Sequence, residues 1–155
     1  MQVAIGVGGA NSGSRRDWDN QVTFVKEAEK LGVDVVWTAE AWGQDAVAPL
    51  AYLAAVTTTM KLGTGIMQIS ARTPSMTAMT ALTMAAISDD RFILGLGASG
   101  PQVVEGLPGR PFKAPVTRMR ETIEIIKMAF AGEKIAYNGQ YHQLPLTGGQ
   151  GKALR

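Results

Sequence analysis

The stretch LGTGIMQISARTP, residues 62–74, joins two elements whose order decides the fold. Its first eight residues, LGTGIMQI, form an apolar run that is typical of a buried β-strand. Thr73 and Pro74 are residue types that cap a helix and occupy its first position, and the pattern beyond them continues to about Ser88. The stretch therefore predicts a strand that is followed directly by a helix.

The same succession recurs along the chain. β-Rich runs that lie roughly 30 residues apart begin at Val3, Asp34, Leu62 and Phe92. Helical patterns are expected over about 17–31, after Asp45, over 73–88 and over 116–130. Strands and helices that alternate at this spacing indicate parallel βαβ units. We therefore predict an α/β protein with (β/α) units of a TIM-type barrel, about half a barrel of four strands and four helices.

Two of the predicted helices have apolar faces that we assign to the core. In the third helix these residues are Met76, Met79, Leu82, Met84 and Ala86. In the fourth, apolar residues spaced three and four apart are Val116, Met119, Ile123, Ile126 and Phe130. Gly132 is expected to end the fourth helix.

Glycines and polar residues gather after every predicted strand. The strands lead into GVGGANSGS, TAEAWGQD, GIMQISART and GLGASGP. The spacing alone leaves open a doubly wound sheet or a barrel, but active sites of barrels lie at the C-terminal ends of the strands. The repeated loop composition favours the barrel.

The segment after the fourth helix departs from the repeat. In KIAYNGQYHQLPL, the pair Asn138-Gly139 stands between two short alternating runs and predicts a hairpin turn. We therefore divide the chain into residues 1–132, half of a (β/α)8 barrel, and residues 133–155, a hairpin or loop tail that leads to the missing second half. A whole barrel takes about 250 residues.

One glycine-rich run raises a competing interpretation. RFILGLGASGP, residues 91–101, contains Gly95-x-Gly97-x-x-Gly100, which is the spacing of the dinucleotide-binding fingerprint. In that motif the third glycine opens a helix that holds a pyrophosphate. Here Pro101 and further Gly and Pro residues precede the next helical pattern, and no second strand with a terminal acidic residue follows. We interpret the match as accidental.

Composition and charge exclude several classes of function. The chain is 46% apolar and 18% charged, as in folded globular proteins, and its net charge of +2 comes from interleaved charges rather than a basic stripe. We therefore expect no nucleic-acid partner and no membrane association. The absence of cysteine excludes disulfides and thiolate chemistry and fits a cytoplasmic location.

Metal and hydrolase chemistry are also disfavoured. The only histidine, His142, lies in the predicted hairpin, and we expect it to stabilise that loop rather than to act as a catalyst. No Asp, Glu and His residues have the spacing of metal ligands, so no metal is expected. Arg15, Arg16 and Arg72 are candidates for contact with an anionic ligand or for solvated surface positions.

Three long stretches resemble one family. They are EAEKLGVDVVWTAEAWGQDA, TTTMKLGTGIMQISARTPSMTAMTALTMAAISDDRFILGLGASGPQVVEGLPGRPF and RMRETIEIIKMAFAGEKIAYNGQYHQLPL. Together they resemble the N-terminal half of the luciferase-like (bacterial luciferase) superfamily, in particular its oxidoreductases that depend on coenzyme F-420. The resemblance implies a barrel that transfers a hydride between this 8-hydroxy-5-deazaflavin and a small organic substrate. Two alternatives stay open: a flavin mononucleotide (FMN)-dependent monooxygenase of the same superfamily, and a catalytically inactive half-barrel that acts as an assembly module.

The resemblance also implies where the deazaflavin ring lies. Family members rest the ring on a bulge in the third strand, which in many of them contains a cis peptide bond between non-proline residues. The matching position here is Gly65-Ile66, and we expect Gly65, Ile66 and Met67 to contact the cofactor. The fourth strand turns outward beside the ring, so its glycines are expected to clear room and to leave backbone N–H groups free. The residues expected nearest the cofactor there are Ala98, Ser99 and Gly100.

Catalytic residues in the family lie at the end of the second strand. The matching residues are Glu40 and Trp42, which we name as the candidate catalytic residues. Ala41 stands where several dehydrogenases of the family have a histidine, which counts against a histidine base. Glu40 could bind the polar edge of the ring or move a proton. A structural role, such as pairing with Arg72, stays open.

Half a barrel would have unpaired edges. Strands near Val3 and Phe92 would each lack a neighbour, and such edges invite pairing. We therefore expect a homodimer, or pairing with a second half-barrel, that closes the strands around a common interior.

Overall fold

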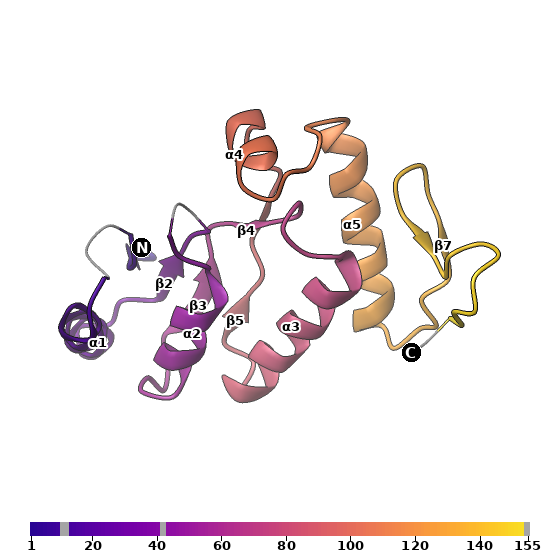
Figure 1. The fold of residues 1–155 in the computed structure, drawn as a ribbon. Coiled ribbons are helices and arrows are strands. Elements are labelled where there is room, and N and C mark those ends of the chain that lie inside the picture. Colours follow the sequence, from indigo (N-terminus) through magenta and orange to yellow (C-terminus); the bar gives the residue numbers. More distant parts are fainter. Residues whose placement is uncertain (10–12, 41–42, 154–155) are drawn as a thin grey trace. The chain divides into compact units, whose positions relative to one another are not determined.

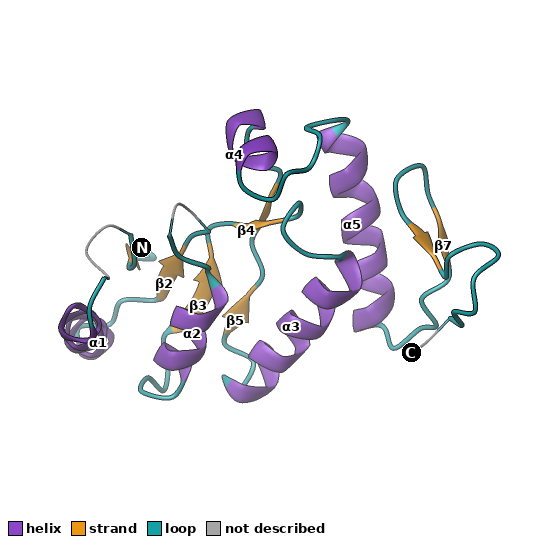
Figure 2. Cartoon of the chain, viewed as in Figure 1, coloured by secondary structure: helices purple, strands orange, loops and turns teal. Residues whose placement is uncertain are grey.

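The computed structural model describes residues 1–9, 13–40 and 43–153 (Figure 1). Figure 2 distinguishes its helices, strands and loops. In chain order the elements are β1 (Ala4–Gly6), α1 (Arg15–Lys30), β2 (Val35–Thr38), α2 (Val47–Ala54), β3 (Lys61–Thr64), β4 (Met67–Gln68), α3 (Pro74–Ile87), β5 (Phe92–Ile93), β6 (Leu96–Gly97), α4 (Pro101–Gly106), α5 (Pro115–Phe130), β7 (Tyr137–Asn138) and β8 (Gln143–Leu144).

The chain divides into two compact units. Unit 1 comprises Met1–Met67 and Thr83–Leu96, and unit 2 comprises Gln68–Leu82 and Gly97–Arg155. Unit 1 contains the strand and helix repeat, and unit 2 contains α5 and the hairpin. We describe each unit by itself.

Unit 1 is built on a parallel sheet in the order β1-β2-β3-β5. In its register Val36 lies opposite Ile5 on one side and Leu62 on the other, and Leu62 lies opposite Phe92. Strands that neighbour one another in chain order, each joined by a helix, are the arrangement that the roughly 30-residue spacing predicts. The predicted α/β class is confirmed.

The core of unit 1 lies between this sheet and its helices. Its fully buried members include Val25 of α1, Leu50 and Leu53 of α2, and Val36 and Leu62 of the sheet. The central strands are therefore covered by apolar side chains, as expected where helices pack on a parallel sheet.

Helix α1 begins two residues before the predicted start. Ser14 is its N-cap: the Ser14 hydroxyl accepts from the Asp17 N–H at 3.2 Å, and the Asp17 carboxylate accepts from the Ser14 N–H at 3.0 Å. This reciprocal capping box satisfies two donors at the helix start. Asp17 therefore acts inside the first turn rather than ahead of it.

The C-terminal half of α1 is tied to β3 by one carboxylate. Glu29 Oε1 accepts from the N–H groups of Thr58, Thr59 and Met60 at 2.9, 2.7 and 2.8 Å. Burial raises the pKa of Glu29, but these donors lower it by more, so its pKa lies below the ordinary value. The loop that enters β3 is thereby anchored to α1.

Arg91, just before β5, connects the ends of two helices. Its guanidinium donates to the carbonyl oxygens of Ala54, Thr57, Met60 and Ser88 and to the Thr57 hydroxyl, at 2.7–3.1 Å. Ala54, Thr57 and Ser88 lie at or just after the ends of α2 and α3, where carbonyl groups lack intrahelical partners. Arg91 therefore has a structural role in unit 1.

In unit 2 the hairpin pairs β7 with β8, and Tyr137 lies opposite Leu144 while Asn138 lies opposite Gln143. The expected hairpin is present, but the predicted Asn138-Gly139 turn is wrong. Asn138 belongs to β7, and the connection is the four-residue loop 139–142, closed by the Gly139 N–H on the His142 carbonyl at 2.8 Å.

Helix α4 was not expected after the glycine-rich run. Gly100 is its N-cap and Pro101 its first residue. Proline is favoured there because the first helical N–H has no intrahelical partner and the fixed φ angle suits a helix. The interpretation of this segment as a run of helix breaks is therefore wrong at Gly100 and Pro101, where a short helix begins.

The predicted apolar faces of α3 and α5 are only partly buried. Met84 is 2% exposed, but Met76, Met79 and Leu82 are 50%, 59% and 46% exposed, so their assignment to the core is wrong. In α5 the assignment holds for Ile126 but fails for three other residues, which are exposed: Val116, Ile123 and Phe130. The buried residues of α5 include Glu121, Thr122 and Ile125. Glu121 thus occupies the buried face of α5, because its carboxylate accepts hydrogen bonds from N–H groups of the hairpin loop.

None of the helices that the structure describes has the length and apolar character needed to cross a lipid bilayer.

Candidate functional site

The ends of β2 and β3 meet in unit 1 at the predicted bulge. The peptide bond between Gly65 and Ile66 is cis, as the resemblance implies. The Gly65 N–H donates to the Thr38 carbonyl at 2.6 Å, and the Glu40 N–H donates to the Ile66 carbonyl at 3.0 Å. These two bonds hold the peptide on both sides. They bring together four of the predicted site residues: Glu40, Gly65, Ile66 and Met67.

The indole of Trp37 lies against the glycines of β3 and the bulge. A Cβ atom placed on Gly63 would lie 2.2 Å from Trp37 Cζ3, whereas one placed on Gly65 would lie 3.5 Å from Trp37 Cε3. Gly63 is therefore required for the packing of the indole, while Gly65 makes only ordinary van der Waals contact. Gly65 is exposed and Ile66 half-buried, so the bulge presents accessible backbone.

Thr64, the last residue of β3, is hydrogen-bonded to Gly95, which directly precedes β6. The Thr64 hydroxyl donates to the Gly95 carbonyl at 2.8 Å and accepts from the Gly95 N–H at 2.9 Å. The Gly95 carbonyl also accepts from the Met67 N–H at 2.8 Å. A Cβ atom on Gly95 would lie 2.0 Å from the Thr64 carbonyl oxygen.

This geometry explains the first glycine of the fingerprint-like run. The sequence predicts that its glycines clear room for a ring and leave N–H groups free. For Gly95 that expectation is wrong, because its N–H is occupied by Thr64 and its missing side chain is required by close approach of two backbones. Gly95 is a packing residue of unit 1.

The remaining cofactor candidates lie in unit 2. Gly97 accepts from the Ile69 N–H at 3.1 Å, and Gly100 accepts from the N–H groups of Val103 and Val104 at the start of α4. Ser99 between them has φ of 58°. Ala98, Ser99 and Gly100 thus form the turn that leads into α4. The six cofactor candidates are divided between the two units, and Trp42 lies outside the described residues.

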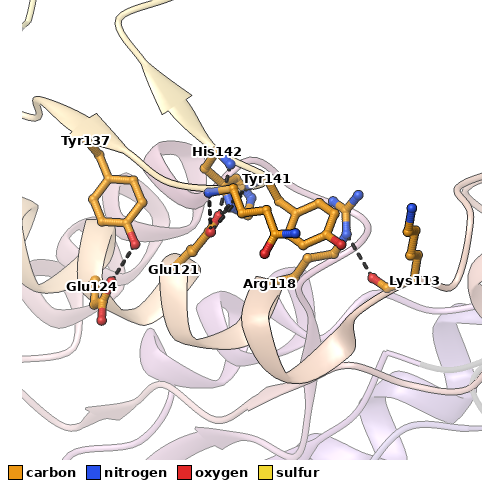
Figure 3. A network of polar contacts seen from close by, with 8 residues as sticks. Lys113, Arg118, Glu121, Glu124, Tyr137, Tyr141 and His142 are labelled. Carbon is orange, nitrogen blue, oxygen red and sulfur yellow. Dashed lines mark hydrogen bonds and ion pairs between the residues drawn. The ribbon is translucent and has the colours of Figure 1, made fainter.

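His142 is part of a network around a buried carboxylate in unit 2 (Figure 3). Glu121 of α5 is 5% exposed and accepts from the N–H groups of Gln140, Tyr141 and His142 at 2.6, 3.0 and 2.9 Å. The His142 Nδ1 lies 2.9 Å from Glu121 Oε2. The expected role of His142 in stabilising the loop agrees with these contacts.

The same network shifts the pKa of Glu121. Burial raises this pKa, but the contact with the His142 ring and the three backbone donors lower it by more, so the carboxyl remains ionised below its ordinary range. Beside it, the hydrogen bond from the Tyr137 hydroxyl to Glu124 raises the pKa of Tyr137 to about 12. The Glu121 carboxylate therefore binds and stabilises the hairpin loop.

A cavity in unit 2 was not predicted from the sequence. Its volume is about 370 Å³, and it lies among the segment after β4, the loop between α4 and α5, the start of α5 and the hairpin loop. Its lining includes Ala98, which was predicted, and Arg72, which was named as a possible anion contact. The other basic residues of the lining are far apart in sequence, so no local motif marks them.

Within residues 1–9, 13–40 and 43–153, no group of three or more His, Asp and Glu side chains could hold a metal ion.

Comparison with known proteins identifies the family. The model of the luciferase-like monooxygenase family matches residues 1–152. The chain belongs to this family. This luciferase-like chain is also 49% identical, over 88% of its length, to a Mycobacterium tuberculosis protein whose name assigns it provisionally as a coenzyme F-420-dependent oxidoreductase. The family and such relatives are enzymes by name.

Solved structures show the same fold. A monooxygenase from Streptomyces bottropensis matches 92% of this luciferase-like chain with a TM-score of 0.82 and 23% identity. The coenzyme F-420-dependent tetrahydromethanopterin reductase of Methanopyrus kandleri matches 92% of the chain with a TM-score of 0.75 and 26% identity. The chain spans 47% and 44% of those two structures and 41% of the M. tuberculosis protein. The predicted TIM-type barrel class is confirmed.

Proposed function

We propose that this luciferase-like chain contributes to an oxidoreductase that transfers a hydride between coenzyme F-420 and a small organic substrate. The observation that carries the proposal is the 49% identity to the M. tuberculosis protein whose name assigns it provisionally as a coenzyme F-420-dependent oxidoreductase. Because the chain spans 41% of that relative, the reaction is proposed for the natural protein that contains this sequence. In the same proposal residues 1–132 form half of the barrel and residues 133–155 its tail.

The strand ends of unit 1 fit a flat ring. The Gly65-Ile66 peptide is fixed by hydrogen bonds to Thr38 and Glu40, and Trp37 lies against Gly65. No side chain extends from Gly65 itself, so a ring could approach its exposed backbone. We propose that Gly65, Ile66 and Met67 of unit 1 hold the ring. In unit 2, Ala98, Ser99 and Gly100 stay candidates for cofactor contact.

When bound, F-420 supplies the hydride-transfer chemistry, and the protein supplies orientation and proton handling. Glu40 is the ionisable residue that the β2 end brings to the bulge, where its own N–H bonds Ile66. We propose that the Glu40 carboxylate binds the polar edge of the ring or moves a proton there. Trp42 stays the second candidate catalytic residue. The small substrate itself is not specified by these residues.

Replacing Glu40 by glutamine tests this role. The amide keeps the size of the side chain but can neither accept a proton nor carry charge, so we expect kcat of the natural protein to fall about 100-fold. The matched control is Glu27→Gln, at an exposed position of α1, which should leave kcat unchanged. An unchanged kcat in Glu40→Gln, with the protein folded, would remove Glu40 from the mechanism.

Titration with two cofactors tests the function as a whole. The absorbance of F-420 and of FMN is followed while each is added to the natural protein. We expect saturable binding of F-420, followed by its reduction or oxidation with substrate. Tight FMN binding without a response to F-420 would favour the monooxygenase alternative. Binding of neither would favour the inactive assembly module.

We also propose that unit 1 pairs with further barrel strands, supplied by a second copy of the chain or by another half-barrel. In the described sheet β1 and β5 each have a neighbour on one side only. Such edges offer unpaired N–H and C=O groups. We expect light scattering after size exclusion to give the mass of a dimer for this chain. A monomer with a cooperative melt would contradict self-pairing.

A further inference from the structure

The parallel sheet of unit 1 has two faces of different character. One row of register partners belongs to the core or packs against it: Ile5, Val36, Leu62 and Phe92. Successive side chains of a strand point to opposite faces, so the next row of partners lies on the face away from the core. That row is Gly6, Trp37, Gly63 and Ile93. Trp37 therefore has a glycine on the strand at either side of it.

The indole of Trp37 lies over only one of these two glycines. A Cβ atom on Gly63 would lie 2.2, 2.4 and 2.9 Å from the indole atoms Cζ3, Cε3 and Cη2, whereas one on Gly6 would meet only the Trp37 carbonyl oxygen, at 3.9 Å. Carbon atoms in contact stay about 3.5–4.0 Å apart, so the indole occupies the space that a side chain at position 63 would need. The indole therefore rests on the β3 backbone and cannot move closer to the sheet.

The same indole borders the bulge. A Cβ atom on Gly65 would lie 3.5 Å from Cε3 and 3.8 Å from Cβ of Trp37. The hydrogen bonds to Thr38 and Glu40 hold the Gly65-Ile66 peptide along the sheet, and the indole supports it on the side of the absent Gly65 side chain. Gly65 is exposed and Trp37 is half-buried. A flat ring that approaches Gly65 from that side therefore meets the indole as well.

We propose that Trp37 is a further cofactor-contacting residue, whose indole supports the ring beside the Gly65-Ile66 peptide and fixes the depth at which the ring lies. This role rests on the proposed function, because it takes the bulge as the place where the ring binds. Aromatic rings in offset or edge-to-face contact attract one another by more than their buried area accounts for. Since the indole already rests on Gly63, it loses little freedom when a ring binds.

Absorbance titration of the natural protein with F-420 tests this contact. Trp37→Ala removes the indole, and Trp37→Phe keeps an aromatic ring at the same position. We expect the Kd of F-420 to rise about tenfold in Trp37→Ala and no more than about threefold in Trp37→Phe. The absorption maximum of bound F-420 should also shift in Trp37→Ala, because an aromatic neighbour of the ring is lost. A purely structural role of Trp37 would leave this maximum unchanged.

Trp18→Ala is the matched control. It removes the same side chain from a half-buried position of α1, outside the bulge, and should keep the wild-type Kd and absorption maximum. A thermal melt shows whether each variant is folded, and Trp37→Leu, with the same expected results, replaces Trp37→Ala if the alanine variant is unfolded. Wild-type values in the folded variant would overturn the role of Trp37 and leave F-420 binding in place. Equal changes in Trp37→Ala and Trp18→Ala would also overturn it.

The same titration with FMN separates a failure of this role from a failure of the proposed function. Deazaflavin and FMN both present a flat system of three fused rings, so the indole should contact either one. If the wild type binds FMN but not F-420, the proposed function is wrong. A shift of the FMN absorption maximum in Trp37→Ala would then still support the role of Trp37, and an unchanged maximum would overturn it. Binding of neither ring would overturn both.

Discussion

Gly95→Ala is expected to lower the free energy of unfolding by about 3 kcal/mol or more. The added methyl group would lie 2.0 Å from the Thr64 carbonyl oxygen, and that oxygen belongs to the backbone of a central strand. The strands would have to separate, which would break the reciprocal hydrogen bonds between Thr64 and Gly95. A shift of the urea midpoint at unchanged slope would measure the loss.

Gly106→Ala is the matched control. A Cβ atom on Gly106 meets no atom within 4 Å, so the same chemical change is expected to leave stability nearly unchanged. If Gly95→Ala is as stable as Gly106→Ala, the close approach of β3 to the segment before β6 is not a feature of the folded protein.

Glu121→Ala is the second substitution with a large expected effect, about 3 kcal/mol of destabilisation. It leaves the N–H groups of Gln140, Tyr141 and His142 without the acceptor that they share. Since hydrogen bonds to a charged group contribute more than neutral ones, and these three act together, the loss is expected to exceed that of a single bond. Denaturant unfolding gives the magnitude, and Glu133→Ala, at an exposed position, is the control.

The pH dependence separates this interpretation from a simple packing defect. The pKa of Glu121 is lowered in the folded protein, so its contribution is present above the unfolded-state pKa of about 4.3 and is lost as the pH falls through the lower, folded-state value. The stability difference between wild type and Glu121→Ala should therefore be smaller at pH 3 than at pH 6. An equal difference at the two pH values would assign the effect to lost packing.

The features that local sequence predicts are those with a local cause. The four β-rich runs and their spacing predicted the parallel sheet. The strand interruption at Gly65-Ile66 was implied by the family resemblance and not by the glycines alone. Two local signals were present but not used. Ser14 and Asp17 have the spacing of a capping box, and Pro101 after Gly100 is typical of a helix start.

The features that were missed depend on contacts between distant parts of the chain. Arg91 bonds residues that precede it by more than 30 positions, and Glu121 bonds a loop about 20 residues later. From the sequence alone, a single arginine or glutamate is expected to be a solvated surface charge. Helical periodicity, in turn, assigns only apolar residues to the core. In α5 that rule failed because the hairpin loop offers three N–H groups, which make a carboxylate the favourable buried residue.

The candidate site was also predictable only in part. Glu40, Gly65 and Ile66 were named through the family resemblance, and parallel strands whose ends meet on one side bring them together. The cavity in unit 2 was not predictable, because its cations come from segments that only the folded chain brings together. Gly95 was predictable only in part. The sequence drew attention to this glycine, but the reason that glycine is required there is the close approach of the Thr64 backbone and not a ligand.

The position of Trp37 gives the protein an intrinsic optical reporter. Its indole packs on Gly63 and lies beside Gly65, the residue proposed to support the ring. Indole emission depends on the immediate surroundings of the side chain, and a deazaflavin that absorbs in the near ultraviolet would accept excitation energy from a tryptophan so close to it. Trp37 is one of three tryptophans in the chain, so in a variant that keeps only Trp37 the fluorescence of this side chain would follow occupancy of the β3 bulge in real time, without an attached label.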